Sequence, residues 1–367
     1  MTIITGLTAA RMLEIEAASV VDGSISGDNL ILTKHDGSTI DAGNVRGIQG
    51  LPGPIGRNRI INGDFSINQR GQTVAILVHG GFVADRWILE CGAASNSLIR
   101  VANTTLDFPD IFSHFVRLTT SSHATSSQYA ALVQKIENVR TFSEQTITVS
   151  FWARASSGTP SVAVELERYF GSLGSTTSHT IVGKTVLSTS PQRYSFTVTV
   201  PSLTNKTINT NGLNDDRLTV RIFVSAGSDF NARTNSLGLQ NTTIDITGVQ
   251  IEEGAVATAF DYRSYVENLL QCQRYYYRSL LYGTELIFPS HASGVTATWL
   301  IPHPVPLRKR GTAISSFVGI VYNLAQGANW AAIALSTGRL VVGSTAISLN
   351  CTATFGVNDY IGVDAEF

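Results

Sequence analysis

Two glutamates in one predicted strand form the first pair of residues that could do chemistry. Glu165 and Glu167 lie in the run 161–169, where apolar and polar residues alternate as they do in a β-strand. Residues two apart on a strand share a face, so we expect their carboxyl groups about 7 Å apart, a separation that glycosidase acid and base pairs use. Such a pair usually lies in a deep cleft on different strands, and adjacent acids on an outer face are commonly just solvated. Glycan cleavage is therefore kept as the alternative function.

Aromatic and charged side chains at outward strand positions form a second candidate. Alternation turns Trp152 and Arg154 outward on one predicted strand, and Glu165 and Tyr169 outward on the next. An aromatic ring stacks on the apolar face of a sugar while charged neighbours bond its hydroxyl groups. We predict that these four residues share one outer face and bind glycan. The alternative is that Trp152 and Tyr169 pack under a loop or against another subunit.

Other catalytic and metal-binding patterns fail in this sequence. The stretch 183–185 resembles the end of a phosphate-binding loop but has Ser178 in place of the required glycine. The stretch 79–81 resembles an oxyanion-hole sequence, but the chain has no Gly-x-Ser-x-Gly elbow to supply a nucleophile. The seven histidines and three cysteines show no metal-ligand spacing. We therefore predict a protein that is not an enzyme, with no catalytic residues and no cofactor.

The elements that must position the candidate residues are strands. Between residues 57 and 263, runs of alternating apolar and polar residues recur between clusters of Gly, Ser and Asn, which is typical of an antiparallel β-sandwich. The runs with the cleanest period of two are residues 146–154, 161–169, 193–200, 217–225 and 242–252.

A glycine repeat precedes this region. In residues 47–56 glycine occupies every third position, at Gly47, Gly50, Gly53 and Gly56, and two prolines lie between. Only glycine fits at the axis of a collagen triple helix, and proline favours the extended backbone of each strand. We predict a short triple helix with these glycines on the axis of a homotrimer. The alternative is a flexible linker between two domains of a monomer.

The residues before the repeat are predicted to form a small trimerising neck. Residues 7–21 are rich in helix-forming residues and carry an apolar stripe, which is best buried against copies of itself. Residues 27–42 indicate a hairpin around the turn pair Asp36-Gly37. Residues 1–46 are therefore predicted to trimerise the chain and attach it to a larger assembly.

The chain after the sandwich is predicted to form a connector and a tip. Residues 264–282 indicate a short helix followed by an aromatic strand, and residues 283–367 a smaller β domain. The predicted fold class is thus mainly β, with a short N-terminal helix and a collagen-like stretch before the sandwich.

Composition excludes several classes of partner. The net charge is −1 and 14% of residues are charged, with no basic block, so nucleic acid is not an expected partner. The chain has no run of 18 apolar residues and no signal-like start, so we expect no membrane span and assembly in the cytoplasm.

Six short motifs in this order resemble those of bacteriophage tail fibre and minor tail proteins, and together they extend over nearly the whole chain. They are Asn58-Arg-Ile-Ile-Asn-Gly-Asp-Phe65, Ala84-Asp-Arg-Trp87, Ser150-Phe-Trp-Ala-Arg154, Gly248-Val-Gln-Ile-Glu-Glu-Gly254 with Ala257-Thr-Ala-Phe-Asp-Tyr-Arg263, Cys272-Gln-Arg-Tyr-Tyr276 and Asp364-Ala-Glu-Phe367.

The resemblance implies a homotrimeric virion protein of the tail tip or fibre. Its neck would dock on other tail or baseplate proteins, and its middle unit would be a carbohydrate-binding jelly roll that recognises bacterial cell-envelope glycan. Related jelly rolls often hold a structural calcium, for which Asp64 or Asp261 could serve here. The family shares no fixed set of sugar-contacting residues. A glycan-depolymerising tail enzyme and a purely structural spacer remain the alternatives.

Overall fold

The computed structural model describes most of the first 280 residues and short strand segments beyond them. The described ranges are 9–26, 29–44, 56–71, 75–92, 95–105, 107–209, 215–280, 297–302, 320–323, 328–330, 339–342, 346–351 and 359–364. The chain is mainly β, and it divides into two compact units, Met1–Gly56 and Arg57–Phe367. Among the helices of the described ranges, none has the length and apolar character to cross a membrane.

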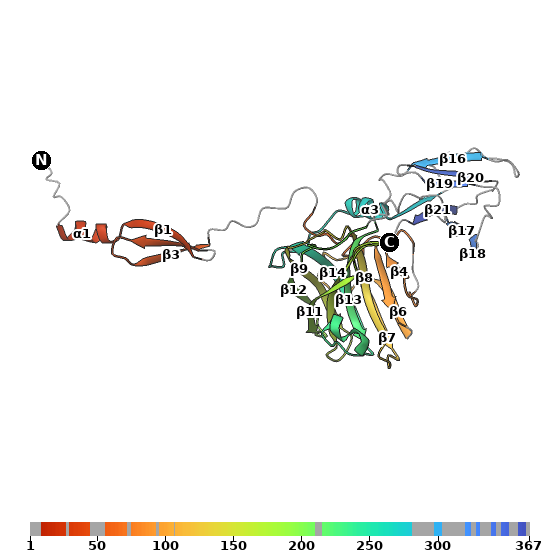
Figure 1. Cartoon of the computed structure of the whole chain (residues 1–367), viewed down its shortest axis with the longest axis horizontal. Coiled ribbons are helices and arrows are strands. Elements are labelled where there is room, and N and C mark those ends of the chain that lie inside the picture. Colours follow the sequence, from red (N-terminus) through yellow and green to blue (C-terminus); the bar gives the residue numbers. More distant parts are fainter. Residues whose placement is uncertain are drawn as a thin grey trace. The chain divides into compact units, whose positions relative to one another are not determined.

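The first unit contains a helix and a three-stranded antiparallel sheet of order β1-β2-β3 (Figure 1). The predicted helix is confirmed but is shorter, because residues 20 and 21 already belong to a strand. The predicted hairpin is confirmed as β2 and β3, whose turn is fixed by the Asp36 carboxylate accepting bonds from Ser38. The bounds are α1 Ala9–Ala17, β1 Val20–Ser26, β2 Asn29–Lys34 and β3 Thr39–Asn44.

The first unit has no core of its own among its described side chains. None of residues 11–26 and 29–43 is buried. Apolar side chains of the helix and the sheet are exposed: Met12, Leu13, Ile15, Val20, Val21, Ile25 and Ile40. Gly47, Gly50 and Gly53 lie outside the described residues, and Gly56 begins the next described segment. The collagen triple helix therefore stays a prediction.

The second unit is built around an antiparallel sandwich of two sheets (Figure 1). Their strand orders are β11-β10-β13-β8-β5-β4 and β12-β9-β14-β7-β6. Successive strands from β7 to β10, and again from β11 to β14, change sheet, as in a jelly roll. The bounds are β4 Phe82–Ala84, β5 Trp87–Cys91, β6 Ser95–Ala102, β7 His114–Ser121, β8 Tyr129–Glu137, β9 Thr146–Ala155, β10 Ser161–Tyr169, β11 Ser178–Val186, β12 Gln192–Thr199, β13 Arg217–Ala226 and β14 Thr243–Glu253.

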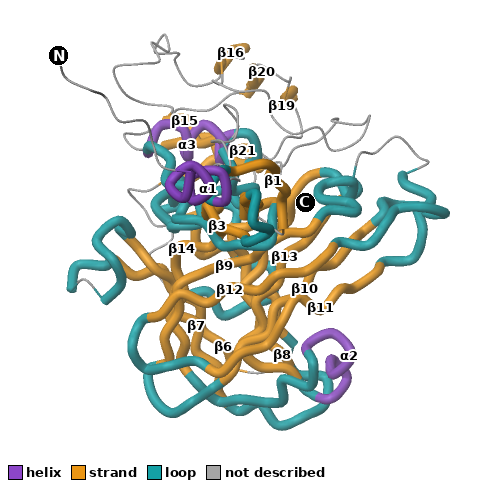
Figure 2. Tube along the Cα trace, turned by 90° about the vertical axis from the view of Figure 1, so that its left-hand side faces the viewer, coloured by secondary structure: helices purple, strands orange, loops and turns teal. Residues whose placement is uncertain are grey.

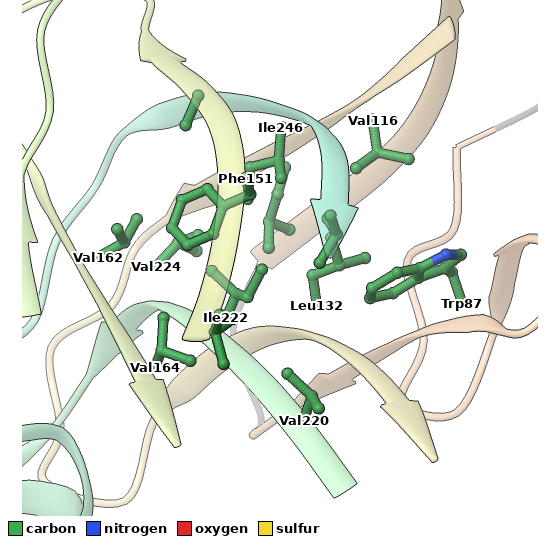
Figure 3. Packing of buried hydrophobic residues seen from close by; sticks show 14 of the residues in the cluster. Trp87, Val116, Leu132, Phe151, Val162, Val164, Val220, Ile222, Val224 and Ile246 are labelled. Atoms are coloured by element: carbon green, nitrogen blue, oxygen red, sulfur yellow. The ribbon is translucent and has the colours of Figure 1, made fainter. Parts of the chain in front are cut away.

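The five best runs of the sequence are confirmed as β9, β10, β12, β13 and β14, each within one residue at both ends. Their inward positions are apolar and meet between the sheets, where Phe151 of one sheet and Val164 and Ile222 of the other belong to one buried cluster (Figure 3). Burying a side chain of this size contributes about 1.5–3 kcal/mol to stability. The core therefore fixes which face of each strand is free to carry function.

Short helices lie at the margins of the sandwich. The 3₁₀ turn η1 Ser228–Phe230 and helix α2 Asn231–Thr234 follow β13, and α2 packs on β10 and β11 (Figure 2). Helix α3 Tyr265–Gln273 begins with a capping box in which Ser264 and Glu267 bond each other's backbone N–H groups. The predicted helix and aromatic strand after the sandwich are confirmed as α3 and β15.

The strands after α3 form two small antiparallel sheets, of order β15-β21-β17-β18 and β16-β20-β19. The bounds are β15 Tyr276–Leu280, β16 Ala297–Pro302, β17 Ile320–Asn323, β18 Ala328–Trp330, β19 Arg339–Val342, β20 Ala346–Cys351 and β21 Asp359–Asp364.

Candidate functional site

The four residues predicted to share one face lie on two different sheets. Trp152 and Arg154 belong to β9 of the five-stranded sheet, while Glu165 and Tyr169 belong to β10 of the six-stranded sheet. The inward residues of both strands meet in the same core, so the outward residues point away from each other on opposite sides of the sandwich. The prediction of a single shared face is therefore wrong. Alternation assigns the face of a strand but not the sheet that the strand joins.

Trp152 packs into an aromatic cluster on the outside of the five-stranded sheet. It is half-buried against Phe108, Phe112 and Phe115. Phe112 in turn contacts Phe260 at 5.1 Å between ring centroids, so a loop before β7 and the segment after β14 both take part. The alternative stated for Trp152, packing under a loop, describes its position. An indole held in this way offers a ligand only part of its surface.

Arg154 belongs to a closed set of ion pairs on the same face. It donates from Nε to Asp245 Oδ2 at 2.9 Å and from Nη1 to Asp107 Oδ1 at 2.9 Å. Arg117 donates two further hydrogen bonds to Asp245, of 2.7 and 2.9 Å. Two arginines thus neutralise two carboxylates. Arg154 therefore stabilises this face, and its guanidinium is already bonded to two carboxylates.

Glu165 lies at the centre of a buried ionic network on the six-stranded sheet, which we call the Glu165 network (Glu90, Glu165, Glu167, His179, Arg221 and Arg233). Its own side chain is fully buried. Arg233 donates two bonds to the Glu165 carboxylate, at 2.7 and 2.8 Å, and His179 Nδ1 lies 2.8 Å from Glu165 Oε1. The carboxylate is therefore neither solvated nor free.

Arg221 links the three carboxylates of the Glu165 network. It donates from Nε to Glu90 Oε2 at 2.7 Å, from Nη1 to Glu167 Oε2 at 2.7 Å, and from Nη1 to Glu165 Oε2 at 3.4 Å. The strand register explains the contact, because Glu165 on β10 pairs directly with Arg221 on β13. Arg233 comes from α2, which packs on the edge of the same sheet.

The electrostatics of the Glu165 network do not suit a general acid. Burial by itself raises the pKa of Glu165, but hydrogen bonds from Arg233 and His179 and the charges of Arg233 and Arg221 lower it to about 2. Glu167 accepts a hydrogen bond of 2.7 Å from Arg221. A glycosidase needs one carboxyl group that keeps its proton near neutral pH. Glu165 is held as the anion and does not match that requirement.

Half-buried groups border the Glu165 network where side chains reach solvent. The Arg217 guanidinium lies over the Tyr169 ring, 4.2 Å from its centroid. Lys135 and Glu167 flank Thr219 on the two neighbouring strands, and Thr219 donates to Glu167 at 3.4 Å. Tyr169, Arg217 and Lys135 are all half-buried, and together they form what we call the Tyr169 rim. A ring, two cations and a fixed carboxylate thus lie side by side.

Sequence reasoning found Tyr169 and the two glutamates but missed the cations around them. Arg217 lies four residues before Arg221 on the same predicted strand, so the alternation already placed both side chains on the same face. Lys135 also lies on a strand, although no run was predicted there. Arg233 lies in a short helix after β13, and nothing local in the sequence indicates that it folds back onto Glu165.

Asp64 and Asp261, the two residues suggested for calcium, line one small polar recess beside Asn58, Arg263 and Asn268. Asp64 Oδ1 accepts bonds from Asn268 and from Ser66, and Asp261 Oδ2 accepts one from the Asn58 N–H. The Arg263 guanidinium lies 3.8 Å from Asp261 Oδ2. Donors and a cation surround these oxygens, so the recess does not fit a calcium ion. Within the described ranges, no group of three acidic, His or Cys side chains is arranged to hold a metal.

Comparison with protein families and with curated proteins gives no match. Among solved structures, the enzymatically active domain of bacteriophage CBA120 tailspike protein 4 matches with TM-score 0.32 and 13% identity, over 54% of this chain and 22% of that one. The CBM22-2 xylan-binding domain of Paenibacillus barcinonensis Xyn10C matches with TM-score 0.30 and 14% identity, over 50% and 100%. The family 11 carbohydrate-binding module of Clostridium thermocellum, in complex with a mixed-linked tetrasaccharide, matches with TM-score 0.30 and 10% identity, over 51% and 100%.

This chain spans about a fifth of the length of the tailspike structure. The strand pairing of this chain itself establishes the two-sheet sandwich.

Proposed function

We propose that this chain is a homotrimeric recognition protein of the phage tail-fibre type, which binds a host cell-envelope glycan without cleaving it. The observation that carries the proposal is the Tyr169 rim next to Glu167. One aromatic ring, two cations and one carboxylate lie on three neighbouring strands of a rigid sheet. The motifs that resemble phage tail proteins supply the biological setting, a virion that adsorbs to a bacterial surface.

The chemistry of the Tyr169 rim suits a sugar. Hydroxyl groups need donors and acceptors held at fixed positions, and a ring face or edge covers the apolar side of the sugar. Arg221 orients Glu167 through a hydrogen bond of 2.7 Å, and a cation–π contact with the Tyr169 ring orients the Arg217 guanidinium. Because these side chains are ordered before a ligand arrives, less entropy is lost on binding.

Two further observations support the proposal. A neck with exposed apolar residues and a following glycine repeat favours three copies of the chain, and three weak glycan contacts add through avidity. The ion pairs of Glu165 favour recognition over cleavage, since its carboxyl group is held as the anion. Glycan cleavage at this site is therefore not the function that we propose.

The test is an array of bacterial envelope polysaccharides probed with the intact chain. We expect retention on at least one polysaccharide and release of no reducing ends. Tyr169→Ala should weaken retention about fivefold to tenfold at each site, because a stacked ring contributes on the order of 1 kcal/mol. Tyr262→Ala is the matched control, because this tyrosine is exposed on the segment after β14. Absence of binding to every polysaccharide, or unchanged binding by Tyr169→Ala, would contradict the proposal.

A further inference from the structure

The amino group of Lys135 is the feature of the Tyr169 rim that the Glu165 network does not use. Lys135 lies on β8, directly across from Thr219 on β13, and is half-buried. Within the part of the chain that the structure describes, no carboxylate forms an ion pair with its ammonium group and no acceptor bonds it. A lysine that is partly withdrawn from water without a partner costs free energy, which a ligand of opposite charge would recover.

The charges around Thr219 leave an excess of cations. The three carboxylates of the Glu165 network are already bonded to two arginines, Arg221 and Arg233. Lys135 and Arg217 add two further positive charges on the same outer face. Glu137, directly across from Arg217 on β8, is bonded by Arg274, so five cations face four carboxylates on this part of the sheet. Burial, followed by the charge of Arg217, lowers the pKa of Lys135, as expected where positive charge accumulates.

The strand register places the two additional cations within reach of one ligand group. Arg217 and Thr219 lie two apart on β13 and share a face, and Lys135 is the cross-strand partner of Thr219. Arg217 and Lys135 are therefore diagonal neighbours on adjacent strands, a relation that long side chains bridge easily. Tyr169 pairs with Arg217 on the next strand, so the ring lies beside this pair of cations.

We propose that the glycan bound at the Tyr169 rim is acidic, with the negative group of one sugar held between the Lys135 ammonium and the Arg217 guanidinium. The inference rests on the proposed function and names its ligand class. The shared chemistry is an anionic oxygen group on a sugar, either the carboxylate of a uronic or sialic acid or a phosphate of the polymer backbone. Tyr169 then contacts the ring that carries this group. Arg221 neutralises Glu167 and Arg274 neutralises Glu137, so each of the two neighbouring carboxylates has a cationic partner.

The experiment uses the intact chain and three acidic polymers, polygalacturonate, polysialic acid and poly(glycerol phosphate) teichoic acid. Each of the first two is immobilised beside the same polymer after reduction of its carboxyl groups to alcohols, and neutral bacterial polysaccharides complete the set. We expect binding to at least one acidic polymer, with a loss of tenfold or more after carboxyl reduction. Binding to the teichoic acid alone identifies phosphate as the anionic group, and binding to a polyuronate or polysialic acid identifies carboxylate.

Charge-removing variants place the interaction on Lys135. Lys135→Met should weaken binding to the acidic polymer about tenfold or more, because a hydrogen bond to a charged group is lost. Lys135→Arg should restore most of the binding. Lys184→Met is the matched control, since Lys184 is exposed on β11 of the same sheet and its amino group bonds the Ser236 carbonyl. The thermal transition of each variant shows whether the fold is kept.

The possible results separate this inference from the proposed function. Binding confined to neutral polysaccharides, or equal losses on acidic and neutral polymers in Lys135→Met, overturns the acidic ligand and leaves glycan binding standing. Binding to no polysaccharide of the array contradicts the proposed function itself, and the acidic ligand fails with it. Unchanged binding of the acidic polymer by a folded Lys135→Met variant overturns the assignment to Lys135.

Discussion

At Glu165, the cationic partners lower the pKa of the carboxyl group by more than burial raises it. Burial favours the neutral acid, yet the bonds from Arg233 and His179 and the nearby charge of Arg221 favour the anion. A buried ion pair of this kind adds little net stability compared with apolar residues, but removal of one partner leaves the others uncompensated. The Glu165 network is therefore sensitive to single substitutions, and its geometry sets the geometry of the Tyr169 rim.

The first prediction concerns this sensitivity. Glu165→Gln should lower the free energy of unfolding by about 3 kcal/mol, because Arg233 and Arg221 lose a common buried anion. Glu253→Gln is the control: its carboxylate is half-exposed and lies 3.9 Å from Arg59, so a change below about 1 kcal/mol is expected. Urea denaturation at neutral pH measures both. Equal small effects of the two variants would mean that the Glu165 network is not structural.

The second prediction concerns pH and His114 on β7. Burial, followed by the charge of Arg100, lowers the pKa of His114 from 6.5 to about 4. The unfolded chain then binds more protons than the folded chain between these values, so stability is full above about pH 6.5 and falls as the pH drops toward 4. His114→Gln should flatten this slope. Urea midpoints measured across that range provide the test, and parallel curves for variant and parent would contradict the assignment.

At the scale of elements, the alternation of residues predicted where five strands begin and end but not how they pair. β9 and β10 both show a period of two, yet β9 pairs with β12 and β14 while β10 pairs with β11 and β13. Pairing partners elsewhere in the chain, such as Ile244 opposite Ala155, decide the sheet, and alternation carries no information about them. Two halves of a predicted site were therefore separated, although each outward residue was assigned correctly.

Aromatic residues from outside β9 reduce the exposure of Trp152, which the pattern of its own strand does not predict. Its position on β9 faces outward, but it packs against the cluster of Phe108, Phe112 and Phe115, on which Phe260 also packs. Gly248 at a bulge in β14 lies close by: a Cβ there would stand 2.5 Å from the Phe112 ring and 3.2 Å from the indole. An outward aromatic residue therefore became part of a secondary apolar cluster.

The third prediction follows from this cluster. Trp152→Ala should lower the free energy of unfolding by about 2–3 kcal/mol, somewhat less than for a fully buried tryptophan, because half of the indole is packed on Phe rings. Glycan binding by the fraction that remains folded should be unchanged, since the Tyr169 rim lies on the other sheet. Thermal unfolding measures the loss of stability, and the polysaccharide array measures the glycan binding. A variant with parental stability and reduced binding would move the site to the five-stranded sheet.

At the scale of the whole molecule, the first unit lacks a buried apolar core within a single copy of the chain. Ordering some fifty residues costs conformational entropy, and only buried apolar surface offsets that cost. None of the described side chains of this unit is buried, while Met12, Ile15 and Ile25 are exposed. Copies of the same unit would cover these residues in the homotrimer that we propose, for which the glycine repeat is the sequence evidence.

The fourth prediction tests this assembly. In the intact chain, Gly50→Val together with Gly53→Val should lower the thermal stability of the assembly and reduce its mass below that of a trimer, because valine does not fit at the axis of a triple helix. Leu51→Val with Ile55→Val is the matched control, since only the glycine positions of a triple helix lie at its axis and these two are not glycine positions. Multi-angle light scattering gives the mass. Unchanged mass and stability in the glycine variant would make the repeat a linker.

The most direct test of the account is the location of the bound glycan. Hydroxyl-radical footprinting of the intact chain, with and without the array polysaccharide that binds most tightly, reports the solvent exposure of individual aromatic and histidine side chains. The account predicts that bound polysaccharide protects Tyr169 and His179 of the six-stranded sheet from oxidation and leaves Trp152 and Tyr262 at their free rates. Protection of Trp152 with unchanged oxidation of Tyr169 and His179 would contradict it.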